Sequence, residues 1–524
     1  MQRSRRHLAP RPLIICTLVA VLVGARAAAA QPEWKPEAYQ APGVRFWREG
    51  DLEEVVASKH LHSWRPLVDK LLSGRGVTLL TIGSSIVENS HGVFFSSRGA
   101  LDALGVRALP PSADLCPLEA RQGGAACVLD GTVAQLMAYI NKTWPHPEHA
   151  LINAGHSGSD LRTLASAGCY DAFLPASADL LIFENHIDDA LCQDCPPRIV
   201  EGVADAEKLY DQLAHRVQHG DAPLPLVMLS YVWVTDPADH ELSWSVGLLR
   251  RNKCNANFTH RVRASMTGVA AEDRLSAAAA YYGWTMLSMR NMLWASLRDG
   301  AHVRLNLSEC EFISALFEDQ IHPSRAGARL MGDALIMLLQ QAVARFGSAN
   351  ATARADAFTL PTEPLVPGSW SERSPMCTEA KDLTIIISDG WEFVAFEDVL
   401  DHASNTMHRV DKPGLLATRA GATVKLLVNT RFMRTNESAP ATLRLGFLRS
   451  YEHMGAARVE CLHHCACAAA TLQAHHESPT SVMADASLNV TQARHCTLQL
   501  TVVDATESGE HKFKLLTLLV LMTQ

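Results

Sequence analysis

Val77-Thr-Leu-Leu-Thr-Ile-Gly-Ser-Ser-Ile86 is the stretch of the sequence that decides the fold. Its short, continuous run of apolar and β-branched residues predicts a strand buried on both faces, and the glycine that follows permits a tight turn. A serine two positions after that glycine is expected to stand free at the carboxyl end of the sheet, where open α/β folds bind ligands. The alternative is a serine that only caps a helix, which is the commoner role of a serine after a strand.

Three further apolar runs follow, and each ends in turn or polar residues: Ala150-Leu-Ile-Asn153, Leu180-Leu-Ile-Phe183 and Leu224-Pro-Leu-Val-Met-Leu229. Long, partly helical segments separate them, which favours a parallel sheet covered by helices on both faces. From Ala326 to Ala344, apolar residues recur at helical spacing. This segment is predicted to be the last helix of the same domain.

Polar motifs stand at the ends of these runs. Asn153-Ala-Gly-His-Ser-Gly158 follows the second run, and Phe183-Glu-Asn-His186 follows the third. A glycine N–H and an asparagine amide are donors of the kind that stabilise a developing oxyanion in acyl transfer. Asp319-Gln-Ile-His-Pro323 precedes the last helix, and its spacing lets a carboxylate orient a histidine that accepts a serine proton.

Taken in order, the four motifs resemble the signature blocks of the SGNH (GDSL-like) hydrolase superfamily, over about residues 77–346. The resemblance implies a flavodoxin-like three-layer α/β/α domain with a parallel sheet, and esterase activity without a cofactor or a metal. It also implies the catalytic roles: Ser85 as nucleophile, His322 as general base, Asp319 as the residue that orients it, and an oxyanion hole made of the Ser85 and Gly158 amides with the Asn185 side chain.

The sequence departs from the family pattern at three positions. Ser84 stands where the family usually has Asp, so either of two adjacent serines can attack, and the spacing from Gly83 favours Ser85. Glu184 and His186 stand where Gly and Asp are usual. With Asp188 and Asp189 they also form a cluster that can be drawn as a metal site, although a solvated loop is the preferred interpretation and no metal is predicted.

The N-terminus indicates the secretory pathway. Arginines at positions 3, 5 and 6 precede an apolar stretch and a run of alanines that ends at Ala30, which is typical of a cleaved signal peptide. An uncleaved signal anchor and residence in the Golgi lumen remain alternatives to an extracellular protein, but the apolar stretch is shorter than the ~20 residues a membrane span needs. Stable membrane insertion is therefore not expected after cleavage. Six sequons are candidate glycosylation sites: Asn141, Asn257, Asn306, Asn350, Asn436 and Asn489.

Composition shifts along the chain define its predicted parts. Residues 31–76 contain a lead-in helix and residues 77–349 the SGNH hydrolase catalytic domain, after the signal peptide of residues 1–30. Residues 350–375 are rich in Ala, Thr, Pro, Glu and Ser, which indicates a linker. Residues 376–524 show short, alternating apolar runs that predict a smaller all-β, sandwich-like C-terminal module. Its last apolar run, Leu515 to Met522, is predicted to be a strand.

The cysteines favour disulfide bonds. Of the 13 cysteines, Cys16 lies in the signal segment and leaves an even set for the mature chain. Cys461, Cys465 and Cys467, with histidines nearby, can be drawn as a zinc site, but disulfides are favoured in a secreted chain. Seven cysteines lie from Cys116 to Cys310 and five from Cys377 onward, so complete pairing within each part is impossible. One bridge is therefore expected to cross the boundary, unless two thiols stay free, and Cys377 is the expected crossing partner.

These observations predict a secreted serine esterase that hydrolyses acyl esters, in particular O-acetyl esters on glycans. The expected partner is an acylated small molecule or polysaccharide, and the side chains after the fourth run are candidates for sugar stacking or for simple core packing: Tyr231, Trp233 and Trp244. A net charge of −8 and the absence of a basic run beyond the N-terminus argue against nucleic acid. Two alternatives stay open, an O-acyltransferase with the same site and a non-catalytic glycan-binding protein. The oligomeric state is not indicated.

Overall fold

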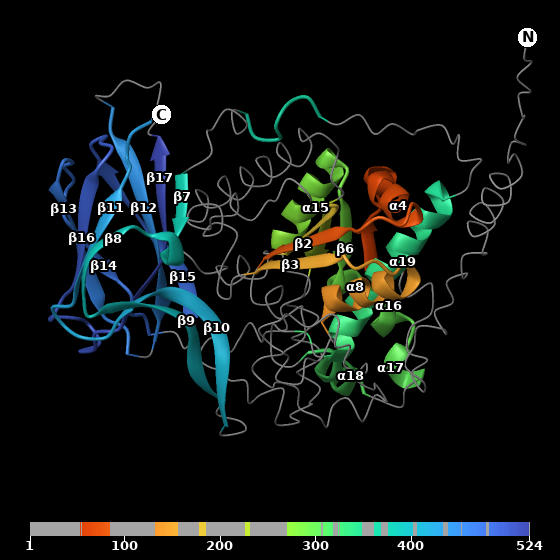
Figure 1. The fold of residues 1–524 in the computed structure, drawn as a ribbon. Helices are drawn as coiled ribbons and strands as arrows, with labels where there is room; N and C mark the ends of the chain where they lie inside the picture. The colour runs from red at the N-terminus through yellow and green to blue at the C-terminus, as the bar shows by residue number, and fades with distance from the viewer. Residues whose placement is uncertain are drawn as a thin grey trace, which may run out of the picture. The chain divides into compact units, whose positions relative to one another are not determined.

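The computed structural model contains one mostly parallel sheet flanked by helices and two antiparallel sheets (Figure 1). The predicted signal peptide lies outside the residues that the structure describes. Within the described part, no helix combines the length and the apolar character needed to cross a bilayer. The described residues are 53, 55–83, 131–155, 178–184, 226–230, 270–304, 308–317, 323, 325–347, 361–367, 376–401, 406–432, 439–451, 453–477 and 481–522.

The first sheet has six strands in the order β1-β6-β5-β4-β2-β3. Strand β1 pairs antiparallel with β6, and the other neighbours pair in parallel. In chain order the strands are β1 (Val56–Ser58), β2 (Thr78–Gly83), β3 (Ala150–Gly155), β4 (Leu180–Glu184), β5 (Leu226–Ser230) and β6 (Thr285–Ser288).

The parallel strands have the flavodoxin-like order. After β2 the chain forms β3 on one side of that strand, and it then forms β4 on the other side. Numbered along the chain from β2, the five parallel strands therefore stand in the order 2-1-3-4-5, which is that of doubly wound flavodoxin-like sheets. The predicted fold class is confirmed, and the strands predicted from the four apolar runs are β2, β3, β4 and β5.

Helices bury the faces of this sheet. Helix α15 packs on β6, where the Ser276 hydroxyl contacts the Met286 sulfur at 3.4 Å. Helices α8 and α19 pack together, and the Thr132 hydroxyl donates to the Ala328 carbonyl across that contact. The helices are α4 (Arg65–Leu72), α8 (Thr132–Thr143), α15 (Ala270–Tyr282), α16 (Met289–Arg298), α17 (Ala301–Arg304), α18 (Glu309–Leu316) and α19 (Arg325–Phe346), with a 3-10 turn η2 (His62–Trp64) before α4.

Side chains at the amino edge of the sheet hold β2 in register. His149 accepts a hydrogen bond from the Val77 N–H through Nδ1 at 3.0 Å, and Asp179 accepts one from the Thr78 N–H at 2.9 Å. Lys70 of α4 forms an ion pair with the same Asp179 carboxylate. Because a buried N–H needs a partner, these bonds fix where β2 starts and therefore where it ends.

The C-terminal module is a sandwich of two antiparallel sheets, as predicted. One has the order β15-β12-β17-β10-β9 with β7 paired to β17, and the other has the order β14-β13-β16-β11-β8. The strands are β7 (Met376–Glu379), β8 (Ile385–Asp389), β9 (Trp391–Asp401), β10 (Thr406–Ala417), β11 (Thr423–Val428), β12 (Ala441–Ser450), β13 (Ala456–His463), β14 (Ala470–Gln473), β15 (Ser481–Val490), β16 (Cys496–Val502) and β17 (Phe513–Met522), with a 3-10 turn η5 (Ala380–Asp382) after β7.

Alternating side chains from both sheets fill the core of the sandwich. Along β11, Val424, Leu426 and Val428 are buried, whereas the residues between them are only half-buried. Phe513 stacks on Phe447 with ring centroids 5.4 Å apart. The predicted final strand is part of β17. This strand lies between β12 and β10 in its sheet and also pairs with the short strand β7.

Two segments, the lead-in and the predicted linker, contain structure that the sequence did not predict. The lead-in contains helix α4, and it also contributes β1 as an edge strand, with hydrogen bonds between His60 and Thr285 beside it. In the predicted linker, residues 361–367 lie against α15: the Tyr281 hydroxyl donates to the Glu363 carbonyl, and Leu365 N–H donates to the Tyr282 hydroxyl, both at 3.0 Å.

Candidate functional site

Three neighbouring strands end together at the carboxyl edge of the first sheet. In the ladders, Gly83 of β2 pairs with Gly155 of β3 on one side and with Glu184 of β4 on the other. Strands β3 and β4 lie on opposite sides of β2, so the strand order reverses between β2 and β4. This reversal is the topological switch point, where open α/β sheets bind ligands. The carboxyl ends of β2 and β4 therefore form the candidate active site.

The predicted catalytic residues lie outside the described part of the chain, but three of them directly follow these strand ends. Ser85 comes two positions after Gly83, Gly158 three positions after Gly155, and Asn185 immediately after Glu184. The nucleophile and two donors predicted for the oxyanion hole are thus attached to three adjacent, in-register strand ends.

A short bridge anchors the segment that carries Asp319 and His322. Phe317 and Pro323 form an isolated antiparallel bridge, and both are buried. Asp319 and His322 lie between these anchors, outside the described residues. Gly327, near the start of α19, is packed so tightly that an added Cβ would lie 2.2 Å from the Leu316 carbonyl oxygen. The end of α18 and the start of α19 therefore hold both ends of this five-residue segment.

A buried polar network at the ends of β5 and β6 was not predicted from the sequence. Ser230 and Ser288 are paired at the carboxyl edge. The Ser288 hydroxyl donates to the buried carboxylate of Glu272 at 2.6 Å, and the Arg290 guanidinium pairs with the same oxygen at 3.1 Å. The network joins α15, β6 and α16. Tyr231 follows Ser230 directly, but Tyr231, Trp233 and Trp244 lie outside the described residues.

Comparison with solved structures identifies the same architecture. The two-domain esterase CEX, described as active on acetylated mannans and co-crystallised with mannopentaose, covers 90% of this chain and 98% of its own, with a TM-score of 0.51 and 14% identity. The acetylxylan esterase Axe2 of Geobacillus stearothermophilus covers 50% of this chain and 94% of its own, with 17% identity, but its TM-score of 0.29 is too low to establish a shared fold.

The chain has the two-part fold of CEX, a flavodoxin-like α/β domain followed by a β sandwich. The similarity to CEX extends over both the α/β domain and the β module. No protein-family model matches the sequence. No curated protein matches it either.

Helix α19 of the α/β domain carries a second ion pair with a buried carboxylate. Arg329 Nε lies 3.0 Å from an Asp333 carboxylate oxygen, one helical turn away. Burial raises the pKa of Asp333 from 3.8 to about 6, although the Arg329 guanidinium opposes the shift. Asp333 is therefore ionised at neutral pH at an energetic cost that its partner only partly offsets.

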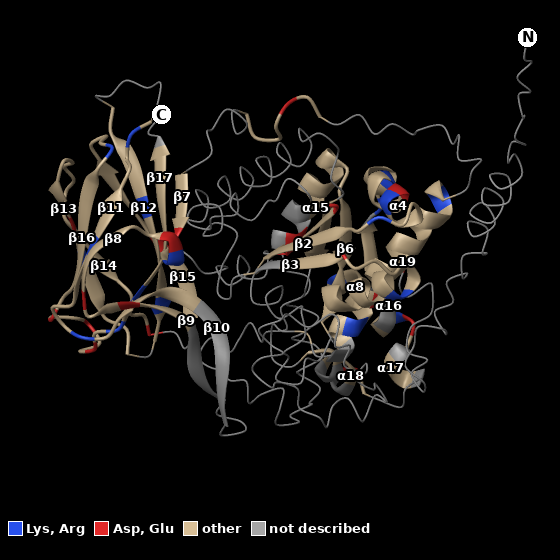
Figure 2. Cartoon of the chain, in the orientation of Figure 1, with Lys and Arg blue, Asp and Glu red and all other residues tan. Residues whose placement is uncertain are grey.

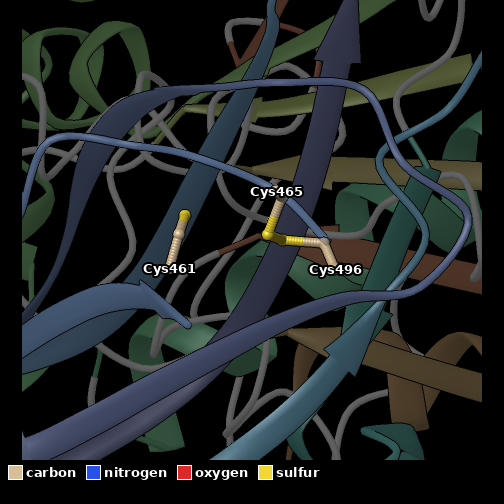
Figure 3. A group of neighbouring side chains, drawn as sticks. All are labelled: Cys461, Cys465 and Cys496. Carbon is tan, nitrogen blue, oxygen red and sulfur yellow. A yellow bond between two sulfur atoms is a disulfide. The ribbon is translucent and has the colours of Figure 1, made fainter. Parts of the chain in front are cut away.

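The cysteines of the β module form disulfides, as the sequence analysis favoured over a zinc site. Cys461 bonds to Cys467, and Cys465 bonds to Cys496. Figure 3 shows the second bond with the Cys461 sulfur beside it, and the sulfur atoms of Cys461, Cys465 and Cys496 lie within 4.8 Å of one another. Because these sulfur atoms are joined in disulfides, they are not the thiolates that zinc needs.

Cys377 is also disulfide-bonded. The other four cysteines of the module pair among themselves, so the partner of Cys377 is one of the cysteines that precede it in the chain. This outcome agrees with the predicted crossing of the domain boundary.

Two of the six sequons lie in described residues. Asn489 is exposed on β15, and Asn141 is half-buried on α8. The other four lie outside the described ranges.

Proposed function

We propose that the chain is a serine esterase that hydrolyses O-acetyl esters on glycans, with Ser85 as its nucleophile. The observation that carries the proposal is the alignment of Gly83, Gly155 and Glu184 at the switch point of a flavodoxin-like sheet. The residues after these three strand ends are the serine, glycine and asparagine that an acyl-transfer site requires.

The proposed reaction has two steps. Ser85 Oγ attacks the ester carbonyl carbon while His322 takes the hydroxyl proton, and Asp319 holds the imidazole in the required orientation. The amides of Ser85 and Gly158 and the side chain of Asn185 stabilise the oxyanion that forms. His322 then returns the proton to the leaving sugar hydroxyl, which leaves an acetyl group on Ser85. Water, deprotonated by His322, hydrolyses this acyl-enzyme and releases acetate.

The substrate class is inferred from the fold and from the expected secretion of the protein. CEX, which shares the two-part architecture, is described as active on acetylated mannans. The predicted signal peptide would bring the protein to extracellular polysaccharides, and Tyr231, Trp233 and Trp244 follow β5 in the sequence. Aromatic faces of this kind stack on sugar rings. The proposed chemistry needs no cofactor and no metal.

Acetate release by purified mature protein tests this proposal. The substrates are p-nitrophenyl acetate, a long-chain p-nitrophenyl ester, acetylated mannan and acetylated xylan. We expect acetate from at least one acetylated polysaccharide, faster turnover of the short ester than of the long one, and loss of both activities in Ser85→Ala. Activity that persists in Ser85→Ala, or a wild-type protein inert toward every substrate, would refute the proposal.

A further inference from the structure

The two disulfides within the β module lie next to each other. The sulfur atom of Cys461, which is bonded to Cys467, lies within 4.8 Å of both sulfur atoms of the Cys465–Cys496 bond (Figure 3). The Cys467 sulfur is outside this group of three. Thiol–disulfide exchange requires a thiolate that can reach a disulfide sulfur. Of the two cysteines in the first bond, Cys461 is therefore the one placed to attack the second bond.

Strand pairing holds two of these sulfur atoms on the same side of their sheet. Cys461 of β13 is paired with Leu498 of β16, and paired residues project to the same face. Cys496 lies two positions before Leu498 on β16, so it shares that face. Leu498 and Cys496 are fully buried in the core of the sandwich, and Cys461 packs against this core. The ladder therefore keeps Cys461 and Cys496 close together when a disulfide opens.

The loop that carries Cys465 and Cys467 is also held by hydrogen bonds. Between these cysteines, the Ala466 N–H donates to the Thr491 hydroxyl at 2.8 Å, and the Thr491 N–H donates to the Ala466 carbonyl at 3.0 Å. Cys467 also forms an isolated bridge with Val490. These contacts do not need the disulfides. A thiol freed in this loop therefore stays near the other sulfur atoms, which favours exchange within the protein.

Exposure favours the first bond as the point of entry for an added thiol. Both cysteines of the Cys461–Cys467 bond are half-buried, whereas Cys496 of the second bond is fully buried. The charged residues of the module are scattered along its strands and turns (Figure 2), and none lies between Cys461 and Cys467 in the sequence. Glu460, which precedes Cys461, is paired with Arg458 at 2.9 Å. This ion pair weakens the repulsion between the carboxylate and a thiolate at Cys461.

We propose that Cys461 is the internal nucleophile of a thiol-sensitive switch, which rearranges the Cys465–Cys496 bond once a low-molecular-weight thiol has opened the Cys461–Cys467 bond. First, the thiolate of the added thiol attacks the Cys467 sulfur. A mixed disulfide forms there, and the electron pair of the broken bond leaves on Cys461. The Cys461 thiolate then attacks the Cys496 sulfur. A Cys461–Cys496 bond forms, and the electron pair leaves on Cys465, which takes up a proton.

The exchange changes what the loop after β13 is tied to. Before it, Cys465 links this loop to Cys496 at the start of β16. Afterwards a disulfide joins β13 to β16 directly, and Cys465 is a free thiol. The number of disulfides is unchanged, so the added thiol is the only co-reactant. This inference goes beyond the proposed function and does not depend on Ser85.

Two matched variants, each lacking the first bond, test the inference. Cys467→Ser leaves the Cys461 thiol, and Cys461→Ser leaves the Cys467 thiol. Both are held at pH 8, where thiols are partly ionised, and then alkylated, and fragment-ion mass spectrometry locates the label. We expect at least about tenfold more label at Cys465 in Cys467→Ser than in Cys461→Ser, because only the Cys461 thiol reaches the second bond.

Wild-type protein treated with glutathione gives a second measurement that does not require a variant to fold. We expect glutathione attached to Cys467 and alkylation at Cys465. Label confined to Cys461 in Cys467→Ser, or equal label at Cys465 in the two variants, would overturn the inference. The same holds for treated wild-type protein whose free thiol is Cys461 or Cys467, or whose cysteines glutathione does not modify.

Discussion

Ser84 and Ser85 are adjacent hydroxyls after the same strand, and only their distance from Gly83 separates their roles. Ser85→Ala is expected to lower kcat by at least ~10³-fold, because loss of the nucleophile leaves only the oxyanion hole and substrate binding. Ser84→Ala is the matched control and should keep kcat within a few-fold. Steady-state kinetics on p-nitrophenyl acetate checks both. The reverse result would shift the nucleophile by one position.

Asn185 follows Glu184 at the edge of the sheet, and we assign its amide to the oxyanion hole. Asn185→Ala is expected to lower kcat by ~10²–10³-fold with little change in KM, since this hydrogen bond strengthens as charge develops in the transition state. The same kinetic assay separates the two parameters. A variant that raises only KM would place the side chain on the bound substrate instead.

Asp333 is expected to make stability depend on pH. Because burial raises its folded pKa to about 6 from 3.8, between about pH 4 and 6 the folded state keeps a proton that the unfolded state has released. Its contribution to the free energy of unfolding therefore falls as pH rises through this window. The difference between the two pKa values corresponds to about 3 kcal/mol.

Urea unfolding at pH 4 and pH 7 measures this effect. Asp333→Asn should gain stability relative to wild type as the pH rises, because it cannot ionise. Asp389→Asn is the control, since Asp389 pairs with Arg419 at an exposed position. Parallel pH profiles for wild type and Asp333→Asn would contradict the assigned pKa.

For single residues, the sequence predicts catalytic motifs that are formed by neighbours along the chain, but it misses ion pairs that depend on how the elements pack. The serine, glycine and asparagine motifs are recognisable because each stands directly after an apolar run. The Glu272–Arg290 and Arg329–Asp333 pairs gave no comparable signal. An exposed i,i+4 pair on a helix looks the same in a sequence as a buried one, and the Glu272–Arg290 pair joins two different helices, α15 and α16.

The contact between the end of α18 and the start of α19, here called the joint, flanks the segment that carries Asp319 and His322. An alanine Cβ at position 327 would lie 2.2 Å from the Leu316 carbonyl oxygen and 3.1 Å from Pro323 Cβ, so backbone must move. Gly327→Ala is expected to cost about 1–3 kcal/mol of stability, typical of overpacking, and to lower kcat because the histidine shifts.

Gly332→Ala on the same helix is its control. The added Cβ would meet the end of the Gln135 side chain at 2.9 Å and the Thr132 carbonyl oxygen at 3.1 Å, on α8. It should lower the melting temperature but leave kcat at wild-type level. Equal kcat in the two variants would show that the joint does not position the catalytic segment.

Elements were predictable where an apolar run was long enough to be distinguished from its surroundings. The apolar runs that form β2, β3, β4 and β5 satisfy this condition, and so does the helical pattern of α19. Strand β6 has only four residues and sits between two helices, and β1 has three. Segments so short carry no measurable period, and pairing with a neighbouring strand decides their conformation.

For the whole molecule, the order of motifs in the sequence already indicated one site, but the strand order was needed to place it. Motifs after successive strands meet only if the strands are neighbours, and the order β4-β2-β3 brings the three strand ends together. The β module was predicted as a sandwich from alternation. The position of β8 at the edge of its sheet and the pairing of β7 with β17 were not predicted, because long-range strand pairings leave no local pattern in the sequence.

Cys377 provides the last prediction, which concerns how the parts of the chain are covalently connected. It is disulfide-bonded to a cysteine that precedes it, and the nearest of these is Cys310, 67 positions away (377 − 310). The Cys461–Cys467 bond spans only 6 positions. In the chain-entropy account a longer closed loop restricts the unfolded chain more, so the Cys377 bond should stabilise by about 2 kcal/mol more than the short one.

Non-reducing peptide mapping and urea unfolding decide this prediction. We expect the Cys377 peptide to be linked to a peptide from before the predicted linker, and Cys377→Ser to lower the free energy of unfolding more than the double change Cys461→Ser and Cys467→Ser does. A Cys377 peptide linked to Cys461, Cys465, Cys467 or Cys496, or a Cys377 that alkylates in the native protein, would show that no bond crosses the boundary. Because the predicted bond would close a loop that includes residues 350–375, its loss should also let protease cleave these residues faster than in wild type.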